Sequence, residues 1–260
     1  MGRSLGKKKS IFKRVVLVIF VIIFIIFGVI VFFSFQDLKQ EDILKQEIIN
    51  YSNMDLASDD YSIYVKTKGD YAYIEEAVKK YYKDLSDNVK IINYYLESND
   101  LKNILSFDKL NSERPNFVKS YATITVARNK VTNAFSKISN LCDEKTVRNL
   151  VDKEKIDEYD YKLYEELMLT KNDISELSST KEKMENLSLQ LNNFFDKAVN
   201  ILDFLKENND NWDYRDNQLY FDTTDLVNKY NSLYQELVDI ASSMDVDDKI
   251  SKKSNDKVTA

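Results

Sequence analysis

Histidine is absent from this 260-residue chain, which also contains only one cysteine, one proline and four glycines. The lack of histidine removes the commonest general base, the commonest zinc ligand and every Ser-His-Asp or Cys-His arrangement. A single cysteine forms no internal disulfide. Because Gly69 is the only glycine after residue 35, a glycine-rich loop that cradles phosphates is excluded there.

Carboxylates remain as the main chemical groups. Paired acids act as catalysts in glycosidases, but among 43 acidic residues some pairs reach a suitable spacing by chance. The neighbours Glu75-Glu76 and Glu165-Glu166 point to different faces of a helix. We therefore expect no catalytic residue, no cofactor and no metal site, and an enzyme ranks third among the functions considered.

The scarcity of glycine and proline also predicts the fold class. Beyond residue 35 they are represented only by Gly69 and Pro115, far below the average usage of about 7 % and 5 %. The turns of a sheet depend on such residues. The sequence therefore predicts an all-α fold, in which a single N-terminal transmembrane helix precedes an elongated antiparallel helical bundle.

A long hydrophobic run is present at residues 15–35, which carry no charge. Twenty-one helical residues span roughly 31 Å, which matches a hydrocarbon core of about 30 Å. The run is longer than the apolar region of a cleaved signal peptide and ends without a small-residue cleavage site, so an uncleaved signal-anchor is favoured over that alternative. The segment before it holds six bases that are predicted to stay in the cytoplasm: Arg3, Lys7, Lys8, Lys9, Lys13 and Arg14.

The remainder of the chain is acidic. All 43 acids but only 31 of the 37 bases follow residue 35, which gives this extracytoplasmic part a net charge of −12. Such a charge disfavours nucleic acid and anionic lipid surfaces as ligands. Lysine far outnumbers arginine, and isoleucine and asparagine are frequent, as in proteins from AT-rich genomes. We expect a single-pass protein of a bacterial plasma membrane.

Apolar residues recur in steps of three and four in four segments, which predicts four long helices: 71–95, 117–142, 177–205 and 226–240. Their breadth and interruptions favour an antiparallel bundle over a continuous parallel coiled coil. The predicted organisation is a basic cytoplasmic segment at 1–14, the anchor at 15–35, a stalk helix and hinge at 36–68, the bundle at 69–243 and a disordered tail at 244–260.

The segment that most resembles a binding site is 208–222, between the third and fourth helices. Trp, Tyr and Arg are enriched at binding hot spots, and loops often carry function. Large aromatic residues are usually buried, however, so the favoured interpretation of the tryptophan is a buried plug that closes the end of the bundle. As a calcium loop the segment fails at two positions, where glycine and glutamate are required. The candidate partner-binding residues are Trp212, Asp213, Tyr214, Arg215 and Tyr220.

Arg128 and Cys142 in the second predicted helix depart from the purely hydrocarbon character of its apolar stripe. Arg128 interrupts the apolar stripe and lies either at its edge, with Ala127 in the core, or in a buried ion pair. Cys142 is expected to be a small buried apolar residue.

The expected function is a non-enzymatic interaction or scaffold module in the cell envelope. Its partners would be the bilayer and another envelope or membrane protein, with self-association also open. The alternative is a ligand-binding, sensor-like bundle that signals through a partner membrane protein. An exposed apolar patch would favour the first function, and a cavity between helices would favour the second.

Overall fold

The computed structural model describes residues 38–216 and 218–244. The predicted anchor at 15–35, the six bases before it and the tail beyond Met244 lie outside the described residues. Within the described part, no helix is both long and apolar enough to cross a membrane.

The described chain is predominantly helical, which confirms the predicted class at that level. A first helix occupies residues 38–52. The elements that follow are α2 (Asp70–Leu96), α3 (Asn99–Lys102), α4 (Phe107–Glu113), α5 (Val118–Leu141), α6 (Glu144–Arg148), α7 (Glu158–Met168), α8 (Lys171–Glu207), a 3-10 turn (Asn209–Asn211), β1 (Trp212–Arg215), β2 (Gln218–Phe221) and α9 (Thr224–Met244).

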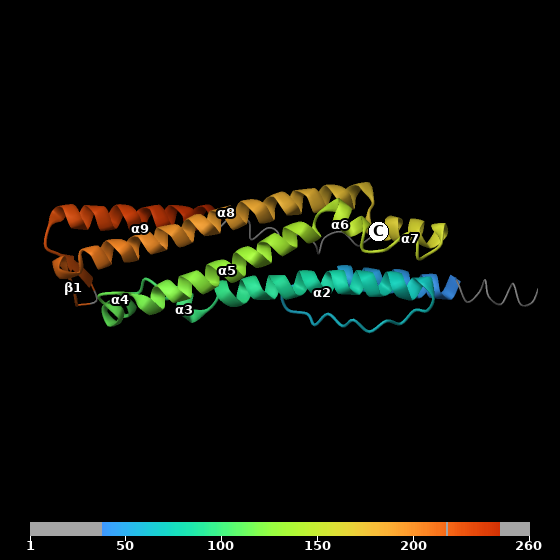
Figure 1. The fold of residues 1–260 in the computed structure, drawn as a ribbon, viewed down its shortest axis with the longest axis horizontal. Coiled ribbons are helices and arrows are strands. Elements are labelled where there is room, and N and C mark those ends of the chain that lie inside the picture. Colours follow the sequence, from blue (N-terminus) through green and yellow to red (C-terminus); the bar gives the residue numbers. More distant parts are fainter. Residues whose placement is uncertain (1–37, 217, 245–260) are drawn as a thin grey trace, which may run out of the picture.

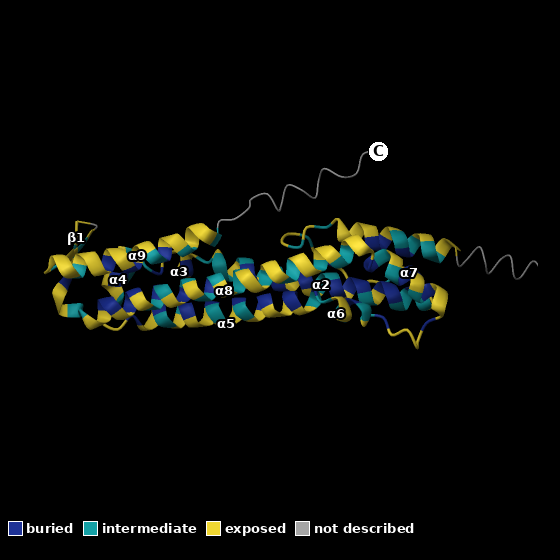
Figure 2. Cartoon of the chain, turned by 90° about the horizontal axis from the view of Figure 1, so that it is seen from above, coloured by how far each residue is buried: buried dark blue, intermediate teal, exposed yellow. Residues whose placement is uncertain are grey.

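The long helices form an elongated antiparallel bundle (Figure 1). The main packed pairs are α2 with α5, α5 with α8, and α8 with α9. At 37 residues, α8 is the longest and extends about 55 Å at 1.5 Å per residue. Its start is fixed by a capping box between Thr170 and Asp173, in which each side chain satisfies the other's backbone N–H. Figure 2 shows the buried residues gathered inside the bundle and the exposed residues outside.

Residues 38–52 are helical, as expected, but they are packed against the bundle. Leu44 is fully buried and Ile48 is 5 % exposed, and both belong to the same apolar cluster as α2. The following segment, 53–69, folds back along α2 (Figure 1). The helix at 38–52 is therefore part of the body of the molecule and does not stand apart from it as a stalk.

A two-stranded antiparallel hairpin is the main departure from the all-helical prediction. β1 pairs with β2 in the register Trp212 to Phe221 and Arg215 to Gln218. Asp216 begins the connection with φ +52°, a left-handed conformation that short hairpin turns require and that aspartate tolerates.

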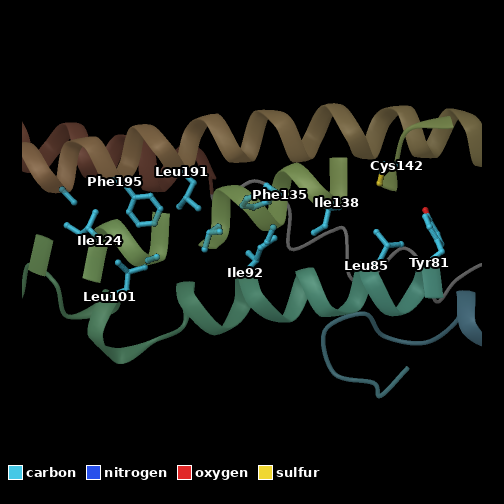
Figure 3. Close-up of a cluster of buried hydrophobic side chains, with 14 of the residues drawn as sticks. Tyr81, Leu85, Ile92, Leu101, Ile124, Phe135, Ile138, Cys142, Leu191 and Phe195 are labelled. Carbon is cyan, nitrogen blue, oxygen red and sulfur yellow. The ribbon is translucent and has the colours of Figure 1, made fainter. Parts of the chain in front are cut away.

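The apolar core continues along the whole bundle, and Figure 3 shows its central part between α2, α5 and α8. The degree to which apolar side chains are buried in this core changes along α8. The C-terminal half holds all the buried residues of this helix: Leu191, Phe195, Ala198, Ile201, Leu202, Phe204 and Leu205. In the N-terminal half, the apolar residues Ile174, Leu177, Met184 and Leu187 remain partly exposed.

Candidate functional site

Trp212 closes the end of the bundle beside the hairpin. Its side chain is 3 % exposed, and its indole Nε1 donates a hydrogen bond to the backbone oxygen of Leu205, 2.8 Å away. The guanidinium carbon of Arg114 lies 4.0 Å from the ring centroid, at cation–π distance. The burial of Trp212 favours the plug interpretation over direct contact with a partner.

Further contacts bind the hairpin to the connection between α4 and α5. Arg114 donates from Nη2 to the backbone oxygen of Trp212 (3.1 Å) and from Nε to Oδ1 of Asn209 (3.1 Å). The Tyr214 hydroxyl donates to Oδ1 of Asp108, 2.6 Å away, and this hydrogen bond raises the pKa of Tyr214. The hairpin is therefore held in place by polar contacts as well as by its buried tryptophan.

The other three candidate residues of the hairpin are exposed. The side chain of Asp213 is 67 % accessible, and Tyr220 is 36 % exposed. Arg215 lies over the Tyr220 ring, with its guanidinium carbon 4.4 Å from the centroid. Of the five predicted residues, Asp213, Arg215 and Tyr220 are thus presented to solvent, whereas Trp212 and Tyr214 hold the hairpin against the bundle.

An exposed apolar stripe lies on α9, which packs against α8 along one side. Tyr230, Leu233 and Leu237 form the buried side of α9. Spacings of seven and four residues place a second group on a neighbouring face. We call this group the α9 stripe; it consists of Val227 (36 % exposed), Tyr234 (45 %) and Val238 (37 %).

A row of aromatic rings connects the α9 stripe with the core. Phe204 lies 5.9 Å from Phe221, and Phe221 lies 5.3 Å from Tyr230, measured between ring centroids. Tyr230 in turn stacks on Tyr234 at 6.2 Å. Because its ring rests on a buried neighbour, Tyr234 presents a supported aromatic surface, the kind of group that is enriched at binding hot spots.

The sequence prediction missed the α9 stripe. Its signal was present, because Val227, Tyr234 and Val238 recur at helical spacing beside the stripe that was identified. The hairpin also had a signal, a polar Asp-Asn pair between the segments WDYR and QLYF. The helical spacing alone does not indicate which face of α9 is covered by another helix, and the Asp-Asn pair alone does not indicate where the hairpin packs.

The surroundings of the α9 stripe are mostly acidic. Asp222, Asp225 and Asp239 are exposed just before α9 and on it, where Lys229 is the one exposed base. Glu236 on α9 pairs with Lys197 of α8, 2.5 Å away, and this contact lowers the pKa of the carboxyl. A surface of this kind is complementary to an apolar patch that has basic residues around it.

The structure also shows where Arg128 of α5 and Cys142, directly after α5, are located. Ala127 occupies the core position and is 2 % exposed. Arg128 lies at the edge, with its side chain 31 % exposed, and pairs with Asp196 of α8. Cys142 is buried, as expected, and burial raises the pKa of its thiol to about 11.

A buried ion network lies toward the opposite end of the molecule. The ammonium group of Lys79 contacts Oε2 of Glu47 (2.7 Å), Oε1 of Glu75 (2.6 Å) and the backbone oxygen of Tyr64 (2.6 Å). The second oxygen of Glu75 accepts from the backbone N–H (2.8 Å) and hydroxyl (2.7 Å) of Thr67. These contacts connect α2 with both the helix at 38–52 and the segment at 53–69.

The network keeps its members charged. Burial opposes ionisation of Glu75, but hydrogen bonds from Lys79 and Thr67 outweigh it and lower the pKa of this carboxyl. Burial also opposes the charge on Lys79, but its bonds to Glu47 and Glu75 raise its pKa. The three N–H donors of Lys79 are all used in these contacts, which hold the helix at 38–52 and the segment at 53–69 against α2.

Three acids meet near the starts of α2 and α7. Ligand atoms of Asp70, Asp157 and Asp160 lie within 4.8 Å of one another. Asp157 caps α7 by accepting from the backbone N–H of Asp160 (2.8 Å), and its own N–H donates to Asp70 (3.3 Å). Acids are favourable at helix N-termini, and this capping accounts for the cluster.

Comparison of the chain with models of protein families, with curated proteins and with solved structures finds no match.

Proposed function

We propose that this protein is a membrane-anchored, non-enzymatic interaction module of the bacterial cell envelope, whose extracytoplasmic bundle binds a partner protein on the α9 stripe. The observation that carries the proposal is the exposed row Val227, Tyr234 and Val238 on a helix that packs mainly on one side. Single exposed apolar residues are ordinary, but three in a row on one helix face form an apolar patch that a partner can cover.

The anchor and the acidic surface support the same function. An uncharged run at 15–35 with six bases before it would hold the bundle outside the membrane, close to other envelope proteins. The net charge of −12 and the acids near the α9 stripe favour a partner whose apolar patch is ringed by lysine and arginine. The ionisable groups of the Lys79 network support the non-enzymatic part, because they are engaged with one another.

Site-specific photo-crosslinking of the full chain in its native host tests the proposal. A photoreactive residue is placed at Tyr234 or Val238, with Gln235 as the matched control, since Gln235 is exposed on the same helix but on another face. Trp212 serves as a buried control. We expect positions 234 and 238 to capture the same envelope protein, and raised salt to reduce the capture.

Three results would overturn the proposal. They are no capture at 234 and 238, equal capture at 235, and capture of only a second copy of this chain, which would make the α9 stripe a surface for self-association. A Tyr234→Ala variant that retains its helical content should lose the crosslink from position 238. That readout separates loss of binding from loss of folding.

A further inference from the structure

A cavity of about 530 Å³ lies between helices at the end of the molecule remote from the hairpin. Its walls are mainly apolar and come from the helix at 38–52 and the residue Leu56 after it, from α2, from the C-terminal end of α5, from α6 and α7, and from the N-terminal half of α8. Figure 3 shows Tyr81 and Leu85 of α2 pointing toward Ile138 of α5 and toward Cys142, the residue after α5, at one side of this region. Leu177 and Met184 of α8 line the cavity as well.

The cavity exists because α5 ends before its neighbours do. In Figure 1, α2 and α8 both continue past the C-terminal end of α5. Shorter elements, α6 and α7, occupy part of the space where a third long helix would otherwise lie. The apolar side chains of α8 that face this space, Leu177 and Met184, are consequently only partly buried.

Two tyrosine hydroxyl groups provide polar contacts in the cavity. Tyr81 and Tyr82 both line it, and their rings lie 5.4 Å apart. Tyr81 is 5 % exposed as a whole residue. Its hydroxyl forms no hydrogen bond with the residues that the structure describes, and it is not among the polar atoms that are fully shut off from solvent. Burial raises the pKa of Tyr82 to about 12, with a contribution from the charge of Asp173. Both phenols are therefore protonated at neutral pH.

The charges at the cavity have one sign. Asp173 and Glu176 of α8 are among its lining residues, which include no lysine or arginine. Lys181, whose charge acts on Cys142 in the cavity wall, is paired with Asp143 at 2.9 Å. The two lining carboxylates therefore disfavour an anionic ligand. A tyrosine hydroxyl in the cavity wall whose hydrogen-bonding capacity is unused favours a ligand that carries a hydrogen-bonding group.

We propose that this cavity binds a small, mainly apolar molecule that carries no anionic group and forms a hydrogen bond with Tyr81. Its volume is within the range of roughly 300–1,000 Å³ found for small-molecule sites. This site is independent of the α9 stripe, which lies toward the other end of α8, so that either proposal can fail alone. Binding here would give the molecule a ligand-holding function in addition to partner binding.

Two fluorescent probes of matched shape test the proposal: N-phenyl-1-naphthylamine, which is uncharged, and 8-anilinonaphthalene-1-sulfonate, which is anionic. The full chain is reconstituted in lipid nanodiscs, and empty nanodiscs give the background. We expect the uncharged probe to bind saturably and the anionic probe to bind at least about tenfold more weakly because of the acidic lining. Glu176→Gln should narrow this difference.

Two matched variants on α8 locate the binding. Leu177→Trp fills the cavity and should abolish binding of the uncharged probe, whereas Leu187→Trp should not, because Leu187 is similarly half-exposed but does not line the cavity. Tyr81→Phe should weaken binding about fivefold, as expected for one lost hydrogen bond. Far-ultraviolet circular dichroism verifies that each variant is folded.

Cys142 offers a second readout because it is the only cysteine of the chain and lies in the cavity wall. At ten times its Kd, the uncharged probe should slow alkylation of Cys142 by N-ethylmaleimide about tenfold. Equal binding of the two probes, a signal that persists in Leu177→Trp, or unchanged alkylation of Cys142 would show that the cavity is only a packing gap.

Discussion

The two halves of α8 carry the same kind of apolar stripe but differ in burial. In the C-terminal half, between α5 and α9, Phe195, Ile201, Leu202 and Leu205 are completely buried. In the N-terminal half no residue reaches that state, and Leu177 and Met184 border the cavity. An amphipathic pattern therefore specifies which face of a helix turns inward, whereas the neighbouring helices determine how completely that face is covered.

The two ends of the bundle are also stabilised differently. At the hairpin end, Trp212 and a fully packed apolar core exclude water. At the cavity end, the ion network of Lys79, Glu47 and Glu75 holds the helix at 38–52 and the segment at 53–69 against α2. Variants at each end therefore test different kinds of interaction.

The largest effect is expected from Lys79→Met. Removal of the lysine leaves buried Glu75 without its counter-ion and Glu47 with only the half-exposed Lys66 as a partner, which costs about 3–5 kcal/mol of unfolding free energy. Chemical denaturation of the full chain measures the loss. Lys80→Met, which removes a solvent-exposed partner of Glu76 on the same helix, is the matched control and should leave stability almost unchanged. Equal stability of the two variants would show that the network contributes nothing.

A pair of leucine truncations tests the contrast within α8 directly. Leu202→Ala removes a fully buried side chain and should cost about 2–5 kcal/mol. Leu177→Ala changes a side chain that is already partly exposed and should cost less than about 1 kcal/mol. Denaturation midpoints at constant m-value provide the comparison. Similar losses would mean that the two halves are packed equally well.

Acidification should weaken the cavity end. The pKa values of Glu47 and Glu75 are lowered in the folded state from an ordinary value of 4.5. Their contribution is therefore complete above that value and is lost as the pH falls through the folded pKa. The raised pKa of Lys79 adds stability that persists at pH values below 10.5 and disappears in stronger alkali.

The control for the pH prediction is Glu75→Gln, which we expect to be less stable at neutral pH and which lacks one of these titrating groups. Between pH 6 and pH 3.5 its denaturation midpoint should fall less than that of the natural chain. A parallel fall in both proteins would assign the acid sensitivity to other carboxylates.

Much of the fold could be predicted from the sequence because it depends on local patterns. The scarcity of glycine and proline and the spacing of three and four residues indicated helices, and the large aromatic surface of Trp212 made burial the favoured interpretation. The edge position of Arg128 followed from the small neighbour, Ala127, that could fill the core position.

The remaining features depend on contacts between distant segments. The network around Lys79 forms because the helix at 38–52 and the segment at 53–69 both pack along α2. No local sequence pattern predicts that Glu47 lies beside a lysine 32 residues away. The cavity depends on where α5 ends relative to α2 and α8. The hairpin depends on the pairing of Trp212–Arg215 with Gln218–Phe221, within a segment that the sequence analysis treated as a loop.

Amide hydrogen exchange along α8 of the full chain tests the central contrast most directly. We expect amides in 191–207 to exchange at least about tenfold more slowly than those in 174–187. Opening the C-terminal half exposes a packed core, whereas opening the N-terminal half exposes much less apolar surface. Equal protection of the amides from exchange along the entire helix would contradict the difference in packing between the two halves of α8.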